Sequence, residues 1–233
     1  MWDVGRDEVS VNRAVILAAG MGSRLKWLTQ NQPKAMMRVQ SEAAIVHVIR
    51  RLAGQGIRQI AINTFHHAEM LMEFLGHGEK WGVNLVFSQE QTLLNSGGGV
   101  RTALDCLHGE GAVLVHNADV LADINLRELA QYCPTHGCAL ALVANPVHHL
   151  QGDFALQGSR VFAEGQPRYT FTGVSIWDEM MLRDYAANTA FSLLEPIRDC
   201  MAKGVCGGLR HRGQWFDIGR PKNLMQAHRH WRG

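Results

Sequence analysis

The sequence lacks long apolar runs, paired cysteine motifs and any strong excess of charge. No apolar segment approaches about 18 residues, the length that a membrane-spanning helix requires. Residues 1–8 include three acidic side chains and no apolar run. We therefore expect no secretory signal, no membrane association and a cytoplasmic location. The five cysteines have no Cys-x-x-Cys spacing, which predicts free thiols packed as small apolar residues and argues against a zinc site.

Charge and length narrow the class further. A formal net charge of +2 is too small to indicate nucleic acid binding, and the basic run 228–232 is typical of a solvated helix end. The chain has 233 residues, of which 46% are hydrophobic, so it is long enough for one domain with a full core and short for two. We predict an N-terminal tail over 1–12 and a single domain over 13–233.

A glycine-rich segment follows directly after an apolar strand near the N-terminus. Residues 14–17 are apolar, alanines follow at 18 and 19, and glycines stand at 20 and 22. This order is typical of a buried parallel strand that runs into a phosphate-binding loop, because glycine lets backbone N–H groups approach an anion. Cations at 24 and 34 follow, which favours a nucleoside triphosphate over an ordinary strand-to-helix turn. The predicted nucleotide contacts are Ala19, Gly20, Met21, Gly22, Ser23, Arg24 and Lys34.

Two common glycine-rich signatures do not fit this segment. A Walker A loop needs Gly-Lys-Ser/Thr, whereas residues 22–24 read Gly-Ser-Arg. The dinucleotide fingerprint needs a third glycine at the position of Leu25. The loop is therefore a phosphate-binding candidate of another kind.

Hydrophobic periodicity predicts alternating helices and strands, followed by shorter strands. Helices are predicted over 42–53, 66–75, 100–107, 125–132 and 191–201, and from Pro221 onward. Strands are predicted over 58–63, 83–88, 112–116, 138–144, 154–157, 160–162 and 169–177. We therefore predict a three-layer α/β fold with a Rossmann-like mixed, mostly parallel sheet. A small antiparallel extension from about residue 145 is expected to build an acceptor pocket.

Polar and glycine-rich positions mark further candidate sites. Gly97–Gly99 stand between a polar loop and a predicted helix, which favours close approach to a ligand over a plain flexible turn. Asn117 and Asp119 follow the strand 112–116, at the sheet edge where open α/β sheets bind ligands. Asp119 and Asp217 are hard oxygen ligands of the kind that Mg²⁺ prefers. Spacing alone does not show that they meet, and a single aspartate after a strand is more often a cap or turn residue.

Together these motifs resemble the sugar-1-phosphate nucleotidyltransferases. The resemblance rests on Leu17-Ala-Ala-Gly-x-Gly-x-Arg24 with Pro33-Lys34, on Leu94-Asn-Ser-Gly-Gly-Gly99 and on Asn117-Ala-Asp119. The blocks 145–154 and 213–219 narrow it to the N-acetylmuramate α-1-phosphate uridylyltransferases of peptidoglycan recycling. The resemblance covers about residues 13–225 and implies a GT-A-like nucleotidyltransferase fold.

The resemblance also implies a reaction and roles for individual residues. The chain would transfer UMP from UTP to a sugar 1-phosphate, giving a UDP-sugar and pyrophosphate, with Mg²⁺ as cofactor. An anionic nucleophile needs no general base, so positioning and charge neutralisation would supply the catalysis. Neither nucleic acid nor membrane is an expected partner, and the protein would be a monomer or a small homo-oligomer.

The implied residue roles divide into three groups. The catalytic cations would be Arg24, on the leaving pyrophosphate, and Lys34, on the α-phosphate. Asp119 and Asp217 would hold the metal. The implied substrate-binding residues are Asn117, Asp153, Gly97 and His149, with Gly98 against the nucleotide. His149 has an equally good interpretation as a turn residue.

Two departures from the family pattern and three alternatives remain. Trp27 and Ala35 stand where relatives have proline, which removes a backbone restriction from the loop. The alternatives are a nucleotidyltransferase for another sugar 1-phosphate or phosphocholine using dTTP, CTP or GTP, a metal-dependent glycosyltransferase, and a non-catalytic nucleotide-binding module. Against the glycosyltransferase, Asn117 occupies the first position of the Asp-x-Asp motif that such enzymes carry.

Overall fold

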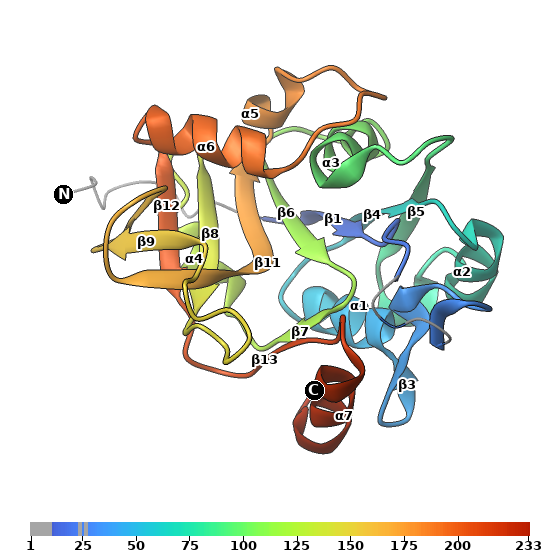
Figure 1. The fold of residues 1–233 in the computed structure, drawn as a ribbon. Coiled ribbons are helices and arrows are strands. Elements are labelled where there is room, and N and C mark those ends of the chain that lie inside the picture. Colours follow the sequence, from blue (N-terminus) through green and yellow to red (C-terminus); the bar gives the residue numbers. More distant parts are fainter. Residues whose placement is uncertain (1–10, 23–24, 26–27) are drawn as a thin grey trace.

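Residues Arg13–Leu17 form β1, an interior strand of a mixed sheet (Figure 1). The computed structural model describes residues 11–22, 25 and 28–233. Within those residues the strand order is β5-β4-β1-β6-β11-β8-β12-β10-β9. Besides β1, the strands of this sheet are β4 Gln59–Thr64, β5 Asn84–Gln89, β6 Ala112–Asn117, β8 Cys138–Val143, β9 Phe154–Gln157, β10 Arg160–Phe162, β11 Arg168–Asp178 and β12 Cys206–Arg210.

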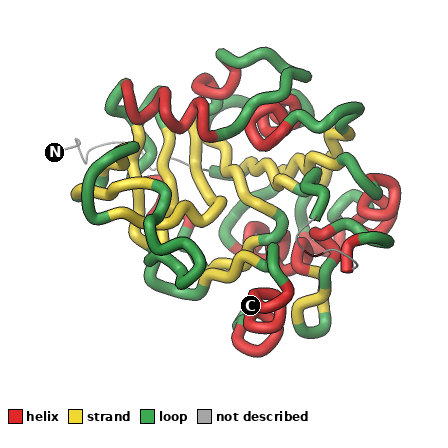
Figure 2. The backbone as a smooth tube through the Cα atoms, viewed as in Figure 1, coloured by secondary structure: helices red, strands yellow, loops and turns green. Residues whose placement is uncertain are grey.

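Helices lie on both faces of this sheet, and two short ladders lie beside it (Figure 2). The ladders pair β2 Arg38–Val39 with β3 Glu42–Ala43, and β7 Val120–Ala122 with β13 Trp215–Asp217. The α-helices are α1 Ala44–Gly54, α2 Ala68–Leu75, α3 Asn95–Leu104, α4 Leu126–Ala130, α5 Met180–Arg183, α6 Leu194–Ala202 and α7 Pro221–His230. The 3-10 turns are η2 Lys34–Met36 and η3 Glu79–Trp81.

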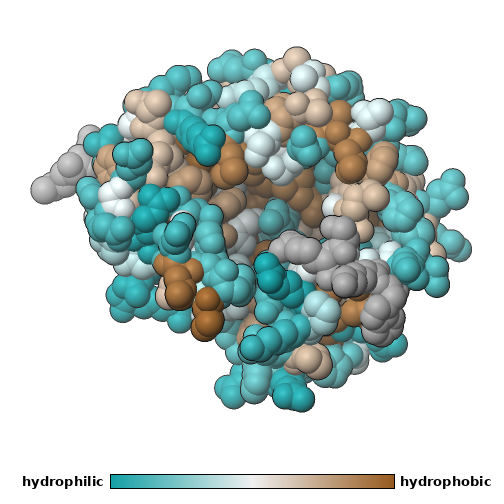
Figure 3. Space-filling model, viewed as in Figure 1, coloured by the Kyte–Doolittle hydropathy of each residue, from teal (hydrophilic) through white to brown (hydrophobic). Residues whose placement is uncertain are grey.

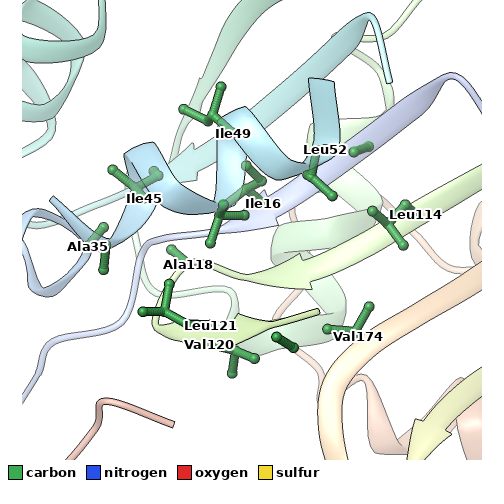
Figure 4. Close-up of a cluster of buried hydrophobic side chains, with 14 of the residues drawn as sticks. Ile16, Ala35, Ile45, Ile49, Leu52, Leu114, Ala118, Val120, Leu121 and Val174 are labelled. Atoms are coloured by element: carbon green, nitrogen blue, oxygen red, sulfur yellow. The ribbon is translucent and has the colours of Figure 1, made fainter. Parts of the chain in front are cut away.

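Alternate residues of β1 point to opposite faces of the sheet, so the molecule has two cores. Ala14 and Ile16 belong to the core against α1, whereas Val15 belongs to the core under α3 and α6. Figure 4 shows Ile16 close to Ile45 and Ile49, which are fully buried residues of α1. Full burial of such a side chain is worth about 2 kcal/mol. These contacts hold β1, and the loop that follows it, against both helix layers.

The pairing pattern confirms a three-layer α/β fold with a mixed sheet. β5, β4, β1 and β6 run parallel, as the alternating pattern of helices and strands predicts. β11 then inserts antiparallel between β6 and β8, and β9 and β10 extend the sheet by antiparallel pairing. Parallel pairing is therefore concentrated in the N-terminal half, where β1 lies, and returns only between β8 and β12 in the described sheet.

Several predicted boundaries differ from the structure. α3 begins at Asn95, five residues before the predicted start, so Gly97–Gly99 are inside the helix. The two-residue strands β2 and β3, the strand β7 and the helix α5 were not predicted, because segments this short carry no periodicity. The five cysteines are free thiols, as predicted, and Cys138, Cys200 and Cys206 are buried. None of the helices in the described part of the chain has the length and apolar character needed to cross a membrane.

Candidate active site

The register of the parallel strands β4, β1 and β6 places Asn63 and Asn117 side by side with the end of β1. Leu17 at the end of β1 pairs with Asn63 of β4 on one side and with Asn117 of β6 on the other. The chain runs from β1 to β4 and β5 on one side of the sheet and then returns to form β6 on the other side. Such a reversal of strand order opens a crevice at the carboxyl edge of the sheet, where α/β proteins bind ligands.

A hollow of about 410 Å³ lies at this edge. Its volume is in the range of small-molecule sites. Figure 3 shows hydrophobic residues gathered around a hollow near the middle of this face of the molecule. The lining residues used below are Leu17, Ala18, Ala19, Gly20, Met21, Gly22, Lys34, Ala35, Asn63, Glu90, Leu93, Asn95, Ser96, Asn117, Ala118, Asp119 and Gly219. We call this space the nucleotide hollow.

The glycine-rich loop forms one wall of the nucleotide hollow. Ala19, Gly20, Met21 and Gly22 all line it, as the sequence predicts. Gly22 has φ +63°, and a β-carbon there would approach the Thr29 side chain to 2.9 Å, so only glycine fits. The predicted contacts Ser23 and Arg24, and the departure at Trp27, lie outside the residues that the structure describes.

Not all loop N–H groups face the hollow. The N–H groups of Ala18 and Ala19 donate to Asn63 Oδ1 over 2.7 and 3.3 Å, so they are bound to the protein rather than available to a phosphate. The Asn63 amide in turn donates to Glu90 Oε1 over 2.8 Å. A polar network inside the sheet edge therefore anchors the start of the loop.

Lys34 and Asp119 meet across the hollow. Lys34 is the first residue of η2, and its Nζ forms an ion pair with Asp119 Oδ2. The side chains are 12% and 21% exposed, so both are largely shielded but still open to the hollow. Ala35, which replaces the proline of the family pattern, is buried beside them. The arrangement supplies one cation and one carboxylate at the floor of the site.

The three consecutive glycines make room for protein groups. A β-carbon at Gly97 would overlap the Phe191 ring, and one at Gly98 would overlap the Thr189 carbonyl oxygen. The N–H groups of both glycines donate to the Phe191 carbonyl oxygen. Gly97 and Gly98 are buried and line neither the nucleotide hollow nor the 340 Å³ hollow at β11, so the ligand contacts predicted for them stay predictions. Their small size serves the packing of α3.

A second hollow of about 340 Å³ adjoins the first. The two share Asn117 and Asp119 in their linings. The second hollow is built from the 145–153 loop, β11 and the β13–α7 segment. Its further lining residues are Val120, His148, His149, Thr170, Phe171, Thr172, Gly173, Trp215, Asp217 and Arg220. We call it the acceptor hollow.

Asp217 reaches the acceptor hollow through the small ladder. In that ladder Asp217 pairs with Val120, the neighbour of Asp119, and the Ile218 N–H donates to the Asp119 carbonyl oxygen over 2.9 Å. Two aspartates that are 98 residues apart in the sequence thus line the same hollow. This juxtaposition is what the spacing alone left undecided.

Asp153 forms hydrogen bonds with two residues that line the acceptor hollow, His149 and Phe171. Its Oδ1 is 2.9 Å from His149 Nε2, and its Oδ2 accepts from the Phe171 N–H over 2.8 Å. Both carboxylate oxygens therefore have protein partners. His149 lines the acceptor hollow, whereas Asp153 is not among its lining residues, although its side chain is 36% exposed. A contact of Asp153 with the sugar phosphate stays a prediction.

A buried histidine lies under the same strand end. His116 of β6 is 6% exposed, and its Nδ1 is 2.9 Å from the Asn117 carbonyl oxygen. Burial lowers the pKa of His116 to about 4, against opposing contributions from that hydrogen bond and from Asp119. The imidazole is therefore neutral at physiological pH, and β6 carries no extra positive charge beneath Asp119.

Sequence analysis missed several residues that line the two hollows. Asn63 ends a predicted strand and Glu90 follows another, so the strand-end rule that identified Asp119 also applies to them. Thr170, Trp215 and Arg220 come from elements whose neighbours in space could not be predicted. Trp215 lies in the block 213–219 that carries the family resemblance, whereas no sequence signal marked Thr170 or Arg220.

Among the described residues, no group of three or more His, Cys, Asp or Glu side chains is placed to hold a metal ion. Asp119 and Asp217 are two carboxylates that line the same hollow, so they are one side chain short of such a group. Asp217 Oδ1 accepts from the Gly219 N–H over 2.8 Å. For the other oxygens, Asp119 Oδ1 and Asp217 Oδ2, no hydrogen bond from a described residue is present.

Comparison with known proteins identifies the family. Residues 13–152 match the family model described as nucleotidyl transferase. The chain is 34% identical to the N-acetylmuramate alpha-1-phosphate uridylyltransferase of Neisseria meningitidis, over 92% of this chain and 96% of that protein. It is 28% identical to the protein of the same name from Caulobacter vibrioides, over 92% and 94% of the two chains.

A solved structure agrees with the fold. A Bacillus anthracis protein assigned as a glucose-1-phosphate thymidylyltransferase has a TM-score of 0.81 at 21% identity, over 93% of this chain and 94% of that one. The residues that match the family model, 13–152, make up more than half of the chain. The chain belongs to the nucleotidyl transferase family.

Proposed function

We propose that this protein transfers UMP from UTP to a sugar 1-phosphate, and that the sugar is N-acetylmuramic acid. The observation that carries the proposal is the junction of the two hollows at Asn117 and Asp119. One hollow has a glycine-rich loop for a polyphosphate, and the other adjoins it directly. A nucleotide α-phosphate and an acceptor phosphate bound on either side of Asp119 would be brought together there.

The chemistry requires that two anions approach each other. The sugar-phosphate oxygen attacks the α-phosphorus of the nucleotide, a P–O bond forms, and the bond to the leaving pyrophosphate breaks. Because the nucleophile is already anionic, no proton has to be removed. Lys34 is the described cation at the junction, and its ammonium group would neutralise charge on the α-phosphate. Arg24 remains the proposed contact of the pyrophosphate.

Asp119 and Asp217 have the right chemistry to hold Mg²⁺. Both are hard oxygen ligands on one hollow, and in the structure Asp119 already accepts a cation in the form of the Lys34 ammonium. Two protein carboxylates leave the remaining positions to water and phosphate oxygens, as is usual for Mg²⁺ at nucleotide sites. Bound there, the ion would neutralise negative charge on the reacting phosphates.

The acceptor hollow fits a phosphorylated sugar. Arg220 offers a cation, β11 contributes residues 170–173 to the wall, and Trp215 adds an aromatic residue. The preference for UTP and for N-acetylmuramic acid rests on the names of the Neisseria and Caulobacter relatives. A role in peptidoglycan recycling and a cytoplasmic location remain predictions from the family resemblance.

Pyrophosphate release by the purified protein tests the proposal. UTP, CTP, GTP, dTTP and ATP are each combined with a panel of sugar 1-phosphates in the presence of Mg²⁺. We expect release with UTP and N-acetylmuramic acid α-1-phosphate, and strong loss in the Asp119→Asn and Asp217→Asn variants. Asp184→Asn, a change at an exposed residue that directly follows α5 and lines neither hollow, is the matched control. Nucleotide binding without release for any pair would favour the non-catalytic module instead.

A further inference from the structure

The buried pair Asn63 and Glu90 connects the two segments that enclose the nucleotide hollow. Asn63 is the penultimate residue of β4 and is 2% exposed, and Glu90 directly follows β5 and is 6% exposed. Asn63 Oδ1 accepts from the loop N–H groups of Ala18 and Ala19. Glu90 Oε2 accepts from the Leu94 N–H over 2.9 Å, directly before α3. One chain of hydrogen bonds therefore runs from the phosphate loop to the start of α3.

The polarity of this chain is fixed at every link. The Asn63 amide must present its oxygen to the two loop N–H groups and its NH₂ group to Glu90 Oε1, because the flipped amide would oppose donors to donors. Glu90 must accept at both oxygens, from Asn63 and from Leu94. A carboxylate does this, whereas an amide has only one acceptor oxygen.

Burial of the Glu90 carboxylate costs free energy of hydration, which an apolar residue in the same place would not lose. A buried carboxylate without a countercharge loses much of its hydration, and none of the described Lys, Arg or His residues forms an ion pair with Glu90. Hydrogen bonds to an ionised acceptor recover part of that cost. Gly99 of α3 leaves the space for the pair, since a β-carbon there would lie 2.7 Å from Glu90 Oε1.

We propose that Asn63 and Glu90 are positioning residues that set the backbone of the phosphate loop and thereby the affinity of the site for the nucleotide. The inference rests on the proposed function in taking the ligand to be a nucleoside triphosphate. Asn63 accepts from the N–H groups of Ala18 and Ala19 and so fixes the position of the backbone directly before Gly20. Through Glu90, the same hydrogen bonds connect this backbone to the start of α3. The loop is then held in place before the triphosphate binds, which reduces the entropy cost of binding.

An exchange of the two functional groups tests this directly. In Asn63→Asp two acceptor carboxylates face each other, and in Glu90→Gln one of the two accepted bonds becomes a contact between donors. In the double variant Asn63→Asp/Glu90→Gln, the carboxylate introduced on β4 accepts from the loop and from the amide introduced after β5. The oxygen of that amide accepts from the Leu94 N–H. Every bond is restored, with the charge moved from one member of the pair to the other.

UTP affinity with Mg²⁺ and without acceptor is measured by calorimetry for the wild type and the three variants. We expect each single variant to bind UTP at least about tenfold more weakly, since each loses a hydrogen bond to a charged group that holds the loop in place. The double variant should come within about threefold of the wild type. Asn84→Asp, the same change at the exposed opposite end of β5, should leave affinity unchanged. A partly unfolded variant would also bind UTP more weakly, because the apparent dissociation constant is the intrinsic one divided by the folded fraction. Melting curves of all variants are therefore recorded, and affinity is compared at a temperature where each variant is fully folded, so that a merely structural role would not change it.

The outcomes separate this inference from the proposed function. Single variants that bind UTP like the wild type overturn the positioning role, and so does a double variant as weak as Glu90→Gln. The latter result would mean that Glu90 contacts the nucleotide itself. If Asn63→Asp does not fold, the comparison of Glu90→Gln with the double variant still decides. UTP binding without pyrophosphate release would overturn the proposed reaction only, and absence of UTP binding in the wild type would overturn both.

Discussion

The buried histidine of β6 makes the stability of this protein depend on pH in a calculable way. His116 has a folded-state pKa of about 4, mainly because burial disfavours the charged ring, and Arg51 adds to the lowering. In the unfolded chain the same group titrates near 6.5. Between these values the unfolded state binds more protons than the folded state, so stability is lost as pH falls from about 6.5 to about 4.

The magnitude follows from the shift. Each pH unit in this window costs about 1.4 kcal/mol, and the whole window costs about 3 kcal/mol. Urea denaturation of the wild type and of His116→Gln at pH 7.5 and pH 5.0 measures the effect. The wild type should lose about 2 kcal/mol more than the variant between the two conditions, because all other groups titrate alike in both. Equal losses in the two proteins would refute the assignment of a buried neutral imidazole.

Three further predictions concern the site and the core. Lys34→Met should lower kcat at least about a hundredfold with little change in melting temperature, and Lys34→Arg should retain part of the rate; a near wild-type rate in Lys34→Met would exclude the proposed charge neutralisation. Asp153→Asn should raise KM for the acceptor through loss of its hold on His149, while UTP affinity stays the same; a weakened UTP affinity would contradict the separation of the hollows. Glu179→Gln should lower the free energy of unfolding by about 3–5 kcal/mol, because Arg13 and Glu179 form an ion pair with both side chains 2% exposed. Denaturant unfolding at neutral pH measures this change. An unchanged midpoint in the variant would contradict the importance of the pair.

Much of the fold could be predicted from periodicity. The stripe of apolar residues in 42–53 predicts α1, and the apolar runs predict the central strands to within a residue or two. These segments are long enough to bury a continuous face, so their pattern reports their environment. The short ladder of β7 and β13 was not predictable, because three residues on each side pair only through contacts that lie far apart in the sequence.

The site residues also fall into those that the sequence predicts and those that only the structure identifies. The glycine loop, Lys34 and Asp119 were identified because their chemistry is local or stands directly after a strand. The meeting of Asp119 with Asp217 depends on the β7–β13 pairing and could only come from the structure. For the glycines 97–99, the sequence predicted close approach to a ligand, whereas the groups packed against them in the structure are Phe191, Thr189 and the Asn63–Glu90 pair. Their neighbours come from distant parts of the chain, so the sequence could not identify them.

The central claim is that the two hollows hold a nucleotide and a sugar phosphate that react at their junction. The most direct test is to incubate the protein with UTP, N-acetylmuramic acid α-1-phosphate and Mg²⁺ and to quantify both products, the UDP-sugar by mass spectrometry and pyrophosphate by an enzymatic assay. We expect equal amounts of the two products from the wild type and at least about a hundredfold less from Asp119→Asn. Product formation by Asp119→Asn at the wild-type rate, or no product from the wild type with UTP and any sugar 1-phosphate, would contradict it.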